Sequence, residues 1–139
     1  MSTGSASVCN YPLCCTENLH RTDEDPGAGY WGAYSCDTPT WTLDATLATI
    51  QKNHPDIDLI LLTGDIPAHD VWQQSKEYNL YTIEVVAKAF EKYFPNIPVL
   101  PAVGNHEGFP VNMFPGNNNR MFVSANIFNF SFYRSNKNK

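Results

Sequence analysis

The sequence predicts an α/β fold built on one βαβ unit. Two apolar runs, residues 59–62 and 97–103, each lead into a glycine followed by polar residues, and a helical pattern over 71–93 separates them. The first run has the length and composition of a strand buried on both faces. Parallel strands end at the same edge of a sheet, where open α/β folds bind ligands. We therefore expect Asp65 and Asn105, which follow the two glycines, to lie side by side.

The first quarter of the chain has the composition of a loop. Turn-forming residues crowd the stretch from Asp25 to Gly32, within a predicted loop segment of residues 1–37. Two aromatic residues in that stretch, Tyr30 and Trp31, either line a substrate cleft or pack over the loop. The sequence leaves both interpretations open.

A first helix is predicted over residues 38–53. Thr38 offers a capping hydroxyl and Pro39 suits the first helical turn. The helix is expected to end at His54-Pro55, because the residue before a proline avoids the helical conformation. We interpret His54 as a solvated residue at the helix end, and His20 as a solvated residue of a polar loop.

The second helix is predicted over residues 71–93. Its apolar residues recur at helical spacing and are expected to face the sheet, not a cofactor. This predicted core stripe consists of Tyr78, Tyr81, Val85, Ala89 and Phe90.

Length and charge limit the class of protein. A chain of 139 residues with 42% hydrophobic residues can bury one core, as expected of one domain at most. Its net charge of −5 and the lack of a basic stripe argue against nucleic acid as a partner. No apolar run approaches the roughly 18 residues that a transmembrane segment needs. Residues 1–7 do not have the basic and apolar regions of a signal peptide.

Cysteine usage predicts an oxidising compartment. An even set of four cysteines lies in the first quarter, in a loop with little core of its own, which favours disulfide staples. The set consists of Cys9, Cys14, Cys15 and Cys36. Four cysteines allow three pairings, and a bridge between the adjacent Cys14 and Cys15 would be strained. Zinc held by four thiolates is the alternative, but the C-x4-C-C spacing matches zinc ribbons poorly. Disulfides without a signal peptide lead us to expect that the natural N-terminus lies upstream.

The residues at the two strand ends carry a family resemblance. Gly64-Asp65 and Gly104-Asn105-His106-Glu107 resemble the GD and GNH[E/D] blocks of the calcineurin-like metallophosphoesterases. The longer strings TGDIPAHDVW and PAVGNHE-x-x-PVN-x-FP resemble the acid sphingomyelinase branch of that family. GD alone carries no information, whereas the two long strings at this spacing are specific. The implied fold is part of a βαβ sandwich with an N-terminal disulfide-stapled loop.

The resemblance implies roles for five residues at this edge. Asp65 would be the carboxylate that bridges two zinc ions, and Asn105 would be a ligand to one of them. His106 would stabilise the transition state or protonate the leaving oxygen, and His69 would lie near the phosphate and share that work. Glu107 would be a supporting residue that orients His106 or a ligand. The resemblance also implies the disulfides Cys9–Cys14 and Cys15–Cys36.

Each of these residues also has a purely structural interpretation. Asp65 could cap the following turn, Asn105 could be a turn residue in the left-handed conformation, and His106 could be a satisfied surface histidine. Singly these interpretations would prevail. The occurrence of the residues together at two strand ends, within the longer family strings, favours the metal site.

The family pattern also implies ligands outside this chain. An Asp-x-His block is expected before the cysteine loop and further histidine blocks after residue 115, so the isolated chain is expected to hold zinc poorly. Loss of the first strand is expected to expose a sheet edge or an apolar face, with a risk of aggregation. We divide the chain into the loop segment 1–37, a metallophosphoesterase core 38–115 and a divergent, disordered tail 116–139.

Two functions follow for this chain. In the first, it is part of a zinc-dependent phosphodiesterase that hydrolyses sphingomyelin or a related phosphodiester, in an extracellular or lysosomal setting. In the second, it is an inactive truncated remnant or a small secreted binding module without a complete metal site. The sequence does not distinguish sphingomyelin from other phosphodiesters, and it does not predict the oligomeric state.

Overall fold

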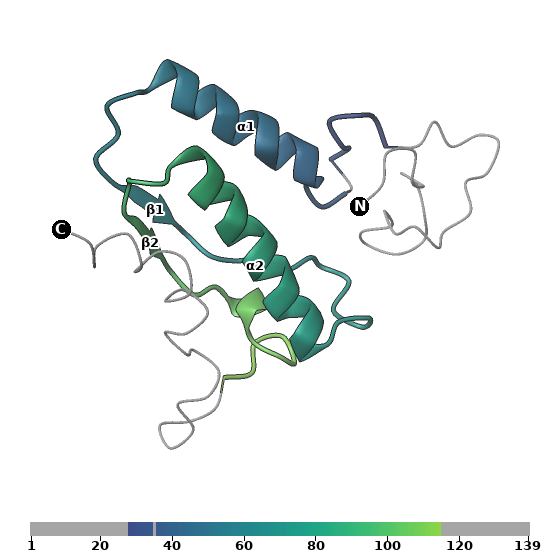
Figure 1. The fold of residues 1–139 in the computed structure, drawn as a ribbon. Coiled ribbons are helices and arrows are strands. Elements are labelled where there is room, and N and C mark those ends of the chain that lie inside the picture. The colour runs from purple at the N-terminus through teal and green to yellow at the C-terminus, as the bar shows by residue number, and fades with distance from the viewer. Residues whose placement is uncertain (1–27, 35, 115–139) are drawn as a thin grey trace. The chain divides into compact units, whose positions relative to one another are not determined.

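The computed structural model of the chain describes residues 28–34 and 36–114. Its elements follow in the order α1 (Thr40–Asn53), β1 (Ile60–Leu62), α2 (Lys76–Tyr93), β2 (Val99–Pro101) and the short 3-10 helix η1 (Asn105–Glu107), as Figure 1 shows. The chain divides into two compact units, Met1–Thr49 and Ile50–Lys139. Both strands, α2 and η1 belong to the second unit, which therefore contains the predicted site.

The two strands form a parallel pair, as a βαβ unit requires. Ile60 lies opposite Val99 and Leu62 lies opposite Pro101. The Ile60 N–H donates to the Pro98 carbonyl at 3.0 Å, and the Ala102 N–H donates to the Leu62 carbonyl at 2.7 Å. The predicted βαβ unit is thus confirmed, and both strands end at the same edge of the sheet.

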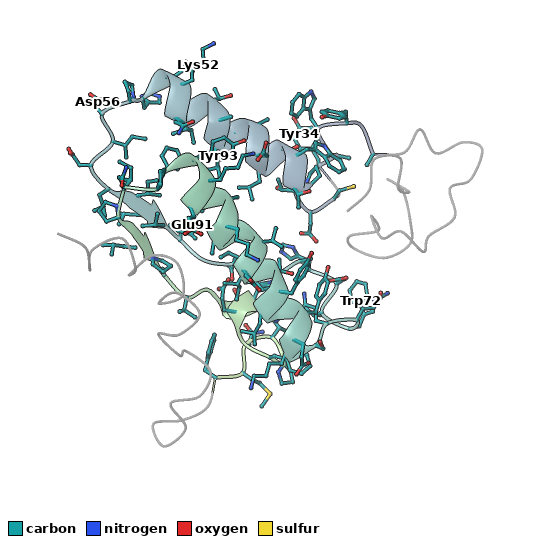
Figure 2. The ribbon with its side chains drawn as sticks, in the orientation of Figure 1. Tyr34, Lys52, Asp56, Trp72, Glu91 and Tyr93 are labelled. Carbon is teal, nitrogen blue, oxygen red and sulfur yellow. The ribbon has the colours of Figure 1, made fainter. Side chains whose placement is uncertain are left out.

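The second helix begins later than predicted. We expected it to start at residue 71, but α2 starts at Lys76. Ser75 has an extended backbone, and its side-chain oxygen accepts a hydrogen bond from the Tyr78 N–H at 3.1 Å. A capping serine of this kind fixes the start of a helix. Residues 71–73 form a turn, which includes the exposed Trp72 labelled in Figure 2.

The predicted core stripe of α2 is wrong in phase. Tyr78 and Tyr81 are 46% and 62% exposed, and of the predicted stripe only Phe90 is buried. The residues that α2 buries are Asn79, Ile83, Ala87 and Phe90. These positions are separated by four, four and three residues, which is helical spacing. The two tyrosines are large and apolar in body, but their polar ends favour water.

The expectation that the first strand is buried on both faces is also wrong. Leu61 is 68% exposed, and Leu100, its register partner on β2, is 55% exposed. Leu59, two residues before Leu61 and therefore on the same face, is 45% exposed. On the other face, Val99 is only 4% exposed. One βαβ unit supplies one crossover helix, and one helix covers one face of a two-stranded sheet.

This exposed leucine face predicts self-association. Contiguous apolar surface on a strand pair favours contact with other apolar surfaces. We expect the chain to form larger species as its concentration rises, and the double variant Leu61→Thr with Leu100→Thr to shift the distribution towards monomer. Threonine has the β-branched shape that strands favour, and it lowers the exposed apolar area.

Sedimentation velocity at several concentrations measures this effect. Leu80→Gln on α2 is the matched control, since Leu80 is a partly exposed leucine outside the sheet at 36% exposure. An unchanged distribution in the double variant, or an equal shift in the control, would contradict the prediction.

The first unit contains most of α1 and a small aromatic cluster. α1 ends at Asn53 as predicted, and it begins at Thr40, just after Pro39, whose carbonyl accepts from the Thr42 N–H at 3.1 Å. The ring of Tyr30 lies edge-on to Trp31 at 4.9 Å and stacks on Trp41 at 5.8 Å. Tyr30 and Trp31 remain 61% and 63% exposed.

Several predictions fall on residues outside the described ranges. The cysteine pairings involve Cys9, Cys14 and Cys15, and the solvated loop histidine is His20; the tail 116–139 also lies there. These predictions, and the division of the chain into three segments, stay predictions. His54 does lie in the described part, and it is exposed after the end of α1, as expected. Among the described helices, none combines the length and hydropathy needed to cross a bilayer.

Candidate functional site

Two glycines bring the strand-end loops into direct contact. Gly64 follows β1 with a φ of 87°, and Asp65 follows with a φ of 56°, so the chain turns sharply through the left-handed region. A Cβ atom on Gly64 would lie 2.5 Å from the Gly104 nitrogen and 2.9 Å from the Ala102 oxygen. The two backbones therefore touch, and this contact sets the spacing of the residues that follow each glycine.

The Asp65 carboxylate joins the loop after β1 to η1. Its Oδ1 accepts a hydrogen bond from the His106 N–H at 3.0 Å. The loops that follow the two strands thus lie next to each other, as expected. The left-handed residue at the site is Asp65, whereas we considered that conformation for Asn105. Asp65 is exposed, so its second oxygen is in reach of solvent or a ligand.

Glu107 holds both loops through three backbone N–H groups. Its Oε2 accepts from Asp65 at 2.9 Å and from Gly104 at 2.6 Å, and its Oε1 accepts from Ile66 at 2.7 Å. Hydrogen bonds to an ionised acceptor are stronger than those between neutral groups. We expected Glu107 to orient His106 or a ligand. The structure shows it acting on the backbone of Asp65 and of its neighbours.

The two histidines of the site lie together. The rings of His69 and His106 are 4.5 Å apart at an interplanar angle of 60°. The His106 Nδ1 lies 3.3 Å from the Ala68 carbonyl oxygen. A carbonyl can only accept, so this contact selects the tautomer with the proton on Nδ1 and presents Nε2 as the second functional nitrogen. The pair can therefore hold or move a proton beside the strand ends.

Asn105 is exposed at the start of η1. Its backbone carbonyl accepts from the Gly108 N–H at 3.3 Å and from the Asn112 N–H at 3.1 Å. These bonds anchor the turn through the main chain, so the amide side chain is not required to cap it. Asn105 directly precedes His106, whose N–H donates to the Asp65 carboxylate, and an amide oxygen is a ligand type that divalent cations accept.

Two further residues support the site, and sequence reasoning missed both. Gln74 donates to the Ala68 carbonyl and, at 3.3 Å, to the Asp70 carboxylate, which ties down the loop that carries His69. Asn79 on α2 donates to the His106 carbonyl at 3.3 Å. A signal for Asn79 existed, because it is in helical phase with Ile83 and so falls on the buried face.

The described residues include few side chains of the types that bind metal ions at the strand ends. Within residues 28–34 and 36–114, no three His, Cys, Asp or Glu side chains are grouped so that they could hold a metal ion. The carboxylate of Asp65 and the amide of Asn105 are oxygen donors that suit a divalent cation. Protein sites for zinc use three or four ligands, however. The donors fit the chemistry of such a site, but in this part of the chain they are too few to complete it.

Comparison with known proteins identifies the family. A sequence profile described as calcineurin-like phosphoesterase matches residues 19–138. The chain belongs to this family. The match includes both strand-end loops, and it also extends through most of the segment 116–139, which we predicted to be divergent. Membership implies the use of a divalent metal ion and confirms the resemblance carried by Gly64-Asp65 and by Gly104 to Glu107.

Curated relatives narrow the similarity to one branch. The chain is 44% identical to the sphingomyelin phosphodiesterase of Bos taurus over 114 residues, which cover 81% of this chain and 18% of the relative. The human sphingomyelin phosphodiesterase is 45% identical, and the alignment again covers 81% of this chain and 18% of the relative. The human acid sphingomyelinase-like phosphodiesterase 3b is 34% identical over 70% of this chain and 22% of the relative. The chain thus spans about a fifth of the length of these relatives.

Proposed function

We propose that this chain carries part of the catalytic centre of a zinc-dependent phosphodiesterase that acts on sphingomyelin or a related phosphodiester. The observation that supports the proposal is the meeting of Asp65, His106 and His69 at one edge of the parallel strand pair. The similarity to sphingomyelin phosphodiesterases gives the substrate class. The proposed setting is lysosomal or extracellular, in keeping with the four cysteines, for which we also propose the disulfides Cys9–Cys14 and Cys15–Cys36.

Each residue has a proposed part in the reaction. Asp65 would bridge two zinc ions and Asn105 would bind one of them. When bound, zinc supplies an activated water and a Lewis acid for the phosphoryl oxygens. The His106 ring, when both of its nitrogens carry a proton, would donate from Nε2 to a phosphate oxygen or to the leaving oxygen, while the adjacent His69 shares that work. Glu107 would keep the backbone around Asp65 in place.

Zinc binding localised by NMR tests the proposed ligands. We expect zinc to perturb backbone resonances at residues 64–66 and 105–107, with weak affinity because few donors are present. Asp65→Ala should abolish the perturbation. Asp56→Ala is the matched control, since it removes the same charge from the loop that precedes β1, as Figure 2 shows.

Two outcomes would contradict the proposed ligands. One is a perturbation confined to other parts of the chain. The other is zinc binding at the strand ends that survives Asp65→Ala.

Few metal-binding side chains are grouped among the described residues, and this favours a second candidate for the chain by itself, a non-catalytic module. We therefore expect little or no hydrolysis of sphingomyelin in vesicles or of a chromogenic phosphodiester by the isolated chain. Zinc-dependent turnover that Asp65→Ala abolishes and Asp56→Ala leaves intact would show that the chain forms a complete site, and it would reject this candidate.

A further inference from the structure

Asn79 is a polar residue in a place that favours an apolar one. It is 2% exposed and lies on the buried face of α2, one turn before Ile83, which is also 2% exposed. Burial of an amide in such surroundings costs free energy unless hydrogen bonds replace those to water. A leucine there would extend the apolar face without that cost. The asparagine therefore calls for an explanation beyond packing.

The Asn79 side chain makes one specific contact, and that contact reaches the site. Its Nδ2 donates to the His106 carbonyl at 3.3 Å, across 27 residues of sequence. The accepting oxygen belongs to the peptide that joins His106 to Glu107. Figure 1 shows η1 beside the N-terminal half of α2, in agreement with this bond. Asn79 thus connects the main helix of the unit to the turn that carries the site residues.

The Asn79 amide oxygen does not contribute a hydrogen bond to the core. Within the described part of the chain, its Oδ1 is buried and has no hydrogen-bond partner. A buried acceptor without a partner is destabilising, so this amide is not optimised for the stability of the core. The contact that distinguishes it from an apolar residue is the one to His106.

Three contacts of His106 come from two elements, the loop after β1 and the helix α2. Its N–H donates to the Asp65 carboxylate at 3.0 Å, its carbonyl accepts from Asn79, and its Nδ1 faces the Ala68 carbonyl. The first and third contacts come from the loop after β1. Only the second, among these three, comes from a helix, which is the more rigid support for a site.

We propose that Asn79 is a positioning residue, which fixes the His106 peptide and so holds the His106 ring against His69. The proposal deepens the proposed function, because His106 has a chemical role only there. Asn79 is buried and is not among the residues proposed to hold metal or substrate. It acts through the orientation of the turn, and loss of its bond should loosen the turn while the apolar core of α2 stays intact.

Variants at Asn79 test this role by NMR on the full chain without zinc. Asn79→Leu removes the donor and keeps similar volume. We expect the nuclear Overhauser effect between the His69 and His106 rings to weaken. We also expect the His106 amide to exchange about five- to tenfold faster, the loss expected for one hydrogen bond. The matched control is Ile83→Val, at an equally buried position on the same face, which should lower stability without either change.

The unsubstituted chain gives a second measurement, should Asn79→Leu not fold. The Asn79 side-chain amide protons should exchange more slowly than those of exposed asparagines and should show contacts to residues 106 and 107. Free exchange of that amide, an unaltered ring contact in Asn79→Leu, or equal changes in Ile83→Val would each overturn the proposal. All these readouts are taken without metal or substrate, so failure of the proposed phosphodiesterase function would leave them unaffected and is recognised separately by the zinc titration.

Discussion

Replacement of Glu107 by glutamine should destabilise the second unit far more than the loss of one surface charge. Both carboxylate oxygens of Glu107 accept from backbone N–H groups, on Asp65, Ile66 and Gly104. Glutamine has the same shape but only one accepting oxygen. Whichever way its amide is turned, an NH₂ group faces at least one N–H donor. With about 1–3 kcal/mol for each donor left unsatisfied, we expect a loss of about 2 kcal/mol in the free energy of unfolding.

Denaturant unfolding of the full chain measures the loss. Glu84→Gln is the matched control, because Glu84 is an exposed glutamate of α2 that pairs with Lys88 at 2.7 Å. The Glu84 carboxylate raises the pKa of Lys88, chiefly through their hydrogen bond. Exposed pairs of this kind contribute little to stability. If Glu107→Gln and Glu84→Gln unfold at the same denaturant concentration, Glu107 is not the clamp that the hydrogen bonds indicate.

The effect should also be local. In Glu107→Gln, the amide protons of Asp65, Ile66 and Gly104 are expected to exchange faster, and zinc perturbation at these residues should weaken. The turn at Asp65 depends on a left-handed backbone conformation that non-glycine residues rarely adopt. The hydrogen bonds that backbone N–H groups donate to Glu107 offset the cost of that conformation, so the site geometry and the stability should be lost together.

The arrangement of the site could be predicted because it depends on topology. Two short apolar runs that each lead to a glycine, with a helix between them, indicate parallel strands. Parallel strands place Asp65 and Asn105 at one edge whatever the side chains between them do. The strand pairing that the structure shows, with Ile60 opposite Val99, meets that expectation.

The supporting contacts could not be predicted, because they depend on where backbone groups point. The three N–H groups that Glu107 binds converge only once Asp65 has turned into the left-handed region. The sequence around Gly64 permits that turn without specifying the direction of each N–H. The resemblance suggested a supporting role for Glu107, but not the groups on which it acts.

The start and phase of α2 were missed for a different reason. Helix-compatible residues continue upstream of Lys76, and the competing signal was the single hydroxyl of Ser75. The predicted stripe counts the two tyrosines as core, although the phase that includes Ile83 and Ala87 is the buried one. That phase also contains Asn79, a residue that apolar periodicity counts as a mismatch.

Replacement of Gly104 by alanine should have one of the largest effects of any single methyl group added to the site. A Cβ there would lie 2.5 Å from the Asp65 Cγ and 2.7 Å from the Asp65 nitrogen, well inside contact distance. The φ of Gly104 is −87°, so the backbone conformation itself suits alanine and the cost comes from the overlap. The Asp65 N–H donates to Glu107, and the Asp65 carboxylate accepts from the His106 N–H. These Asp65 atoms therefore cannot move away without the loss of a hydrogen bond.

We expect Gly104→Ala to cost about 3 kcal/mol in the free energy of unfolding, at the upper end for overpacking, and to abolish the zinc perturbation at the strand ends. Gly29→Ala is the matched control, because a Cβ on Gly29 would meet its nearest atom, the Gly32 oxygen, at an ordinary 3.5 Å. Denaturant unfolding and the zinc titration measure the two effects. A Gly104→Ala chain that kept both its stability and the perturbation would show that the strand-end loops are not in contact. The close approach of two backbones is what turns two separate strand ends into one site, and this substitution tests it without altering any donor.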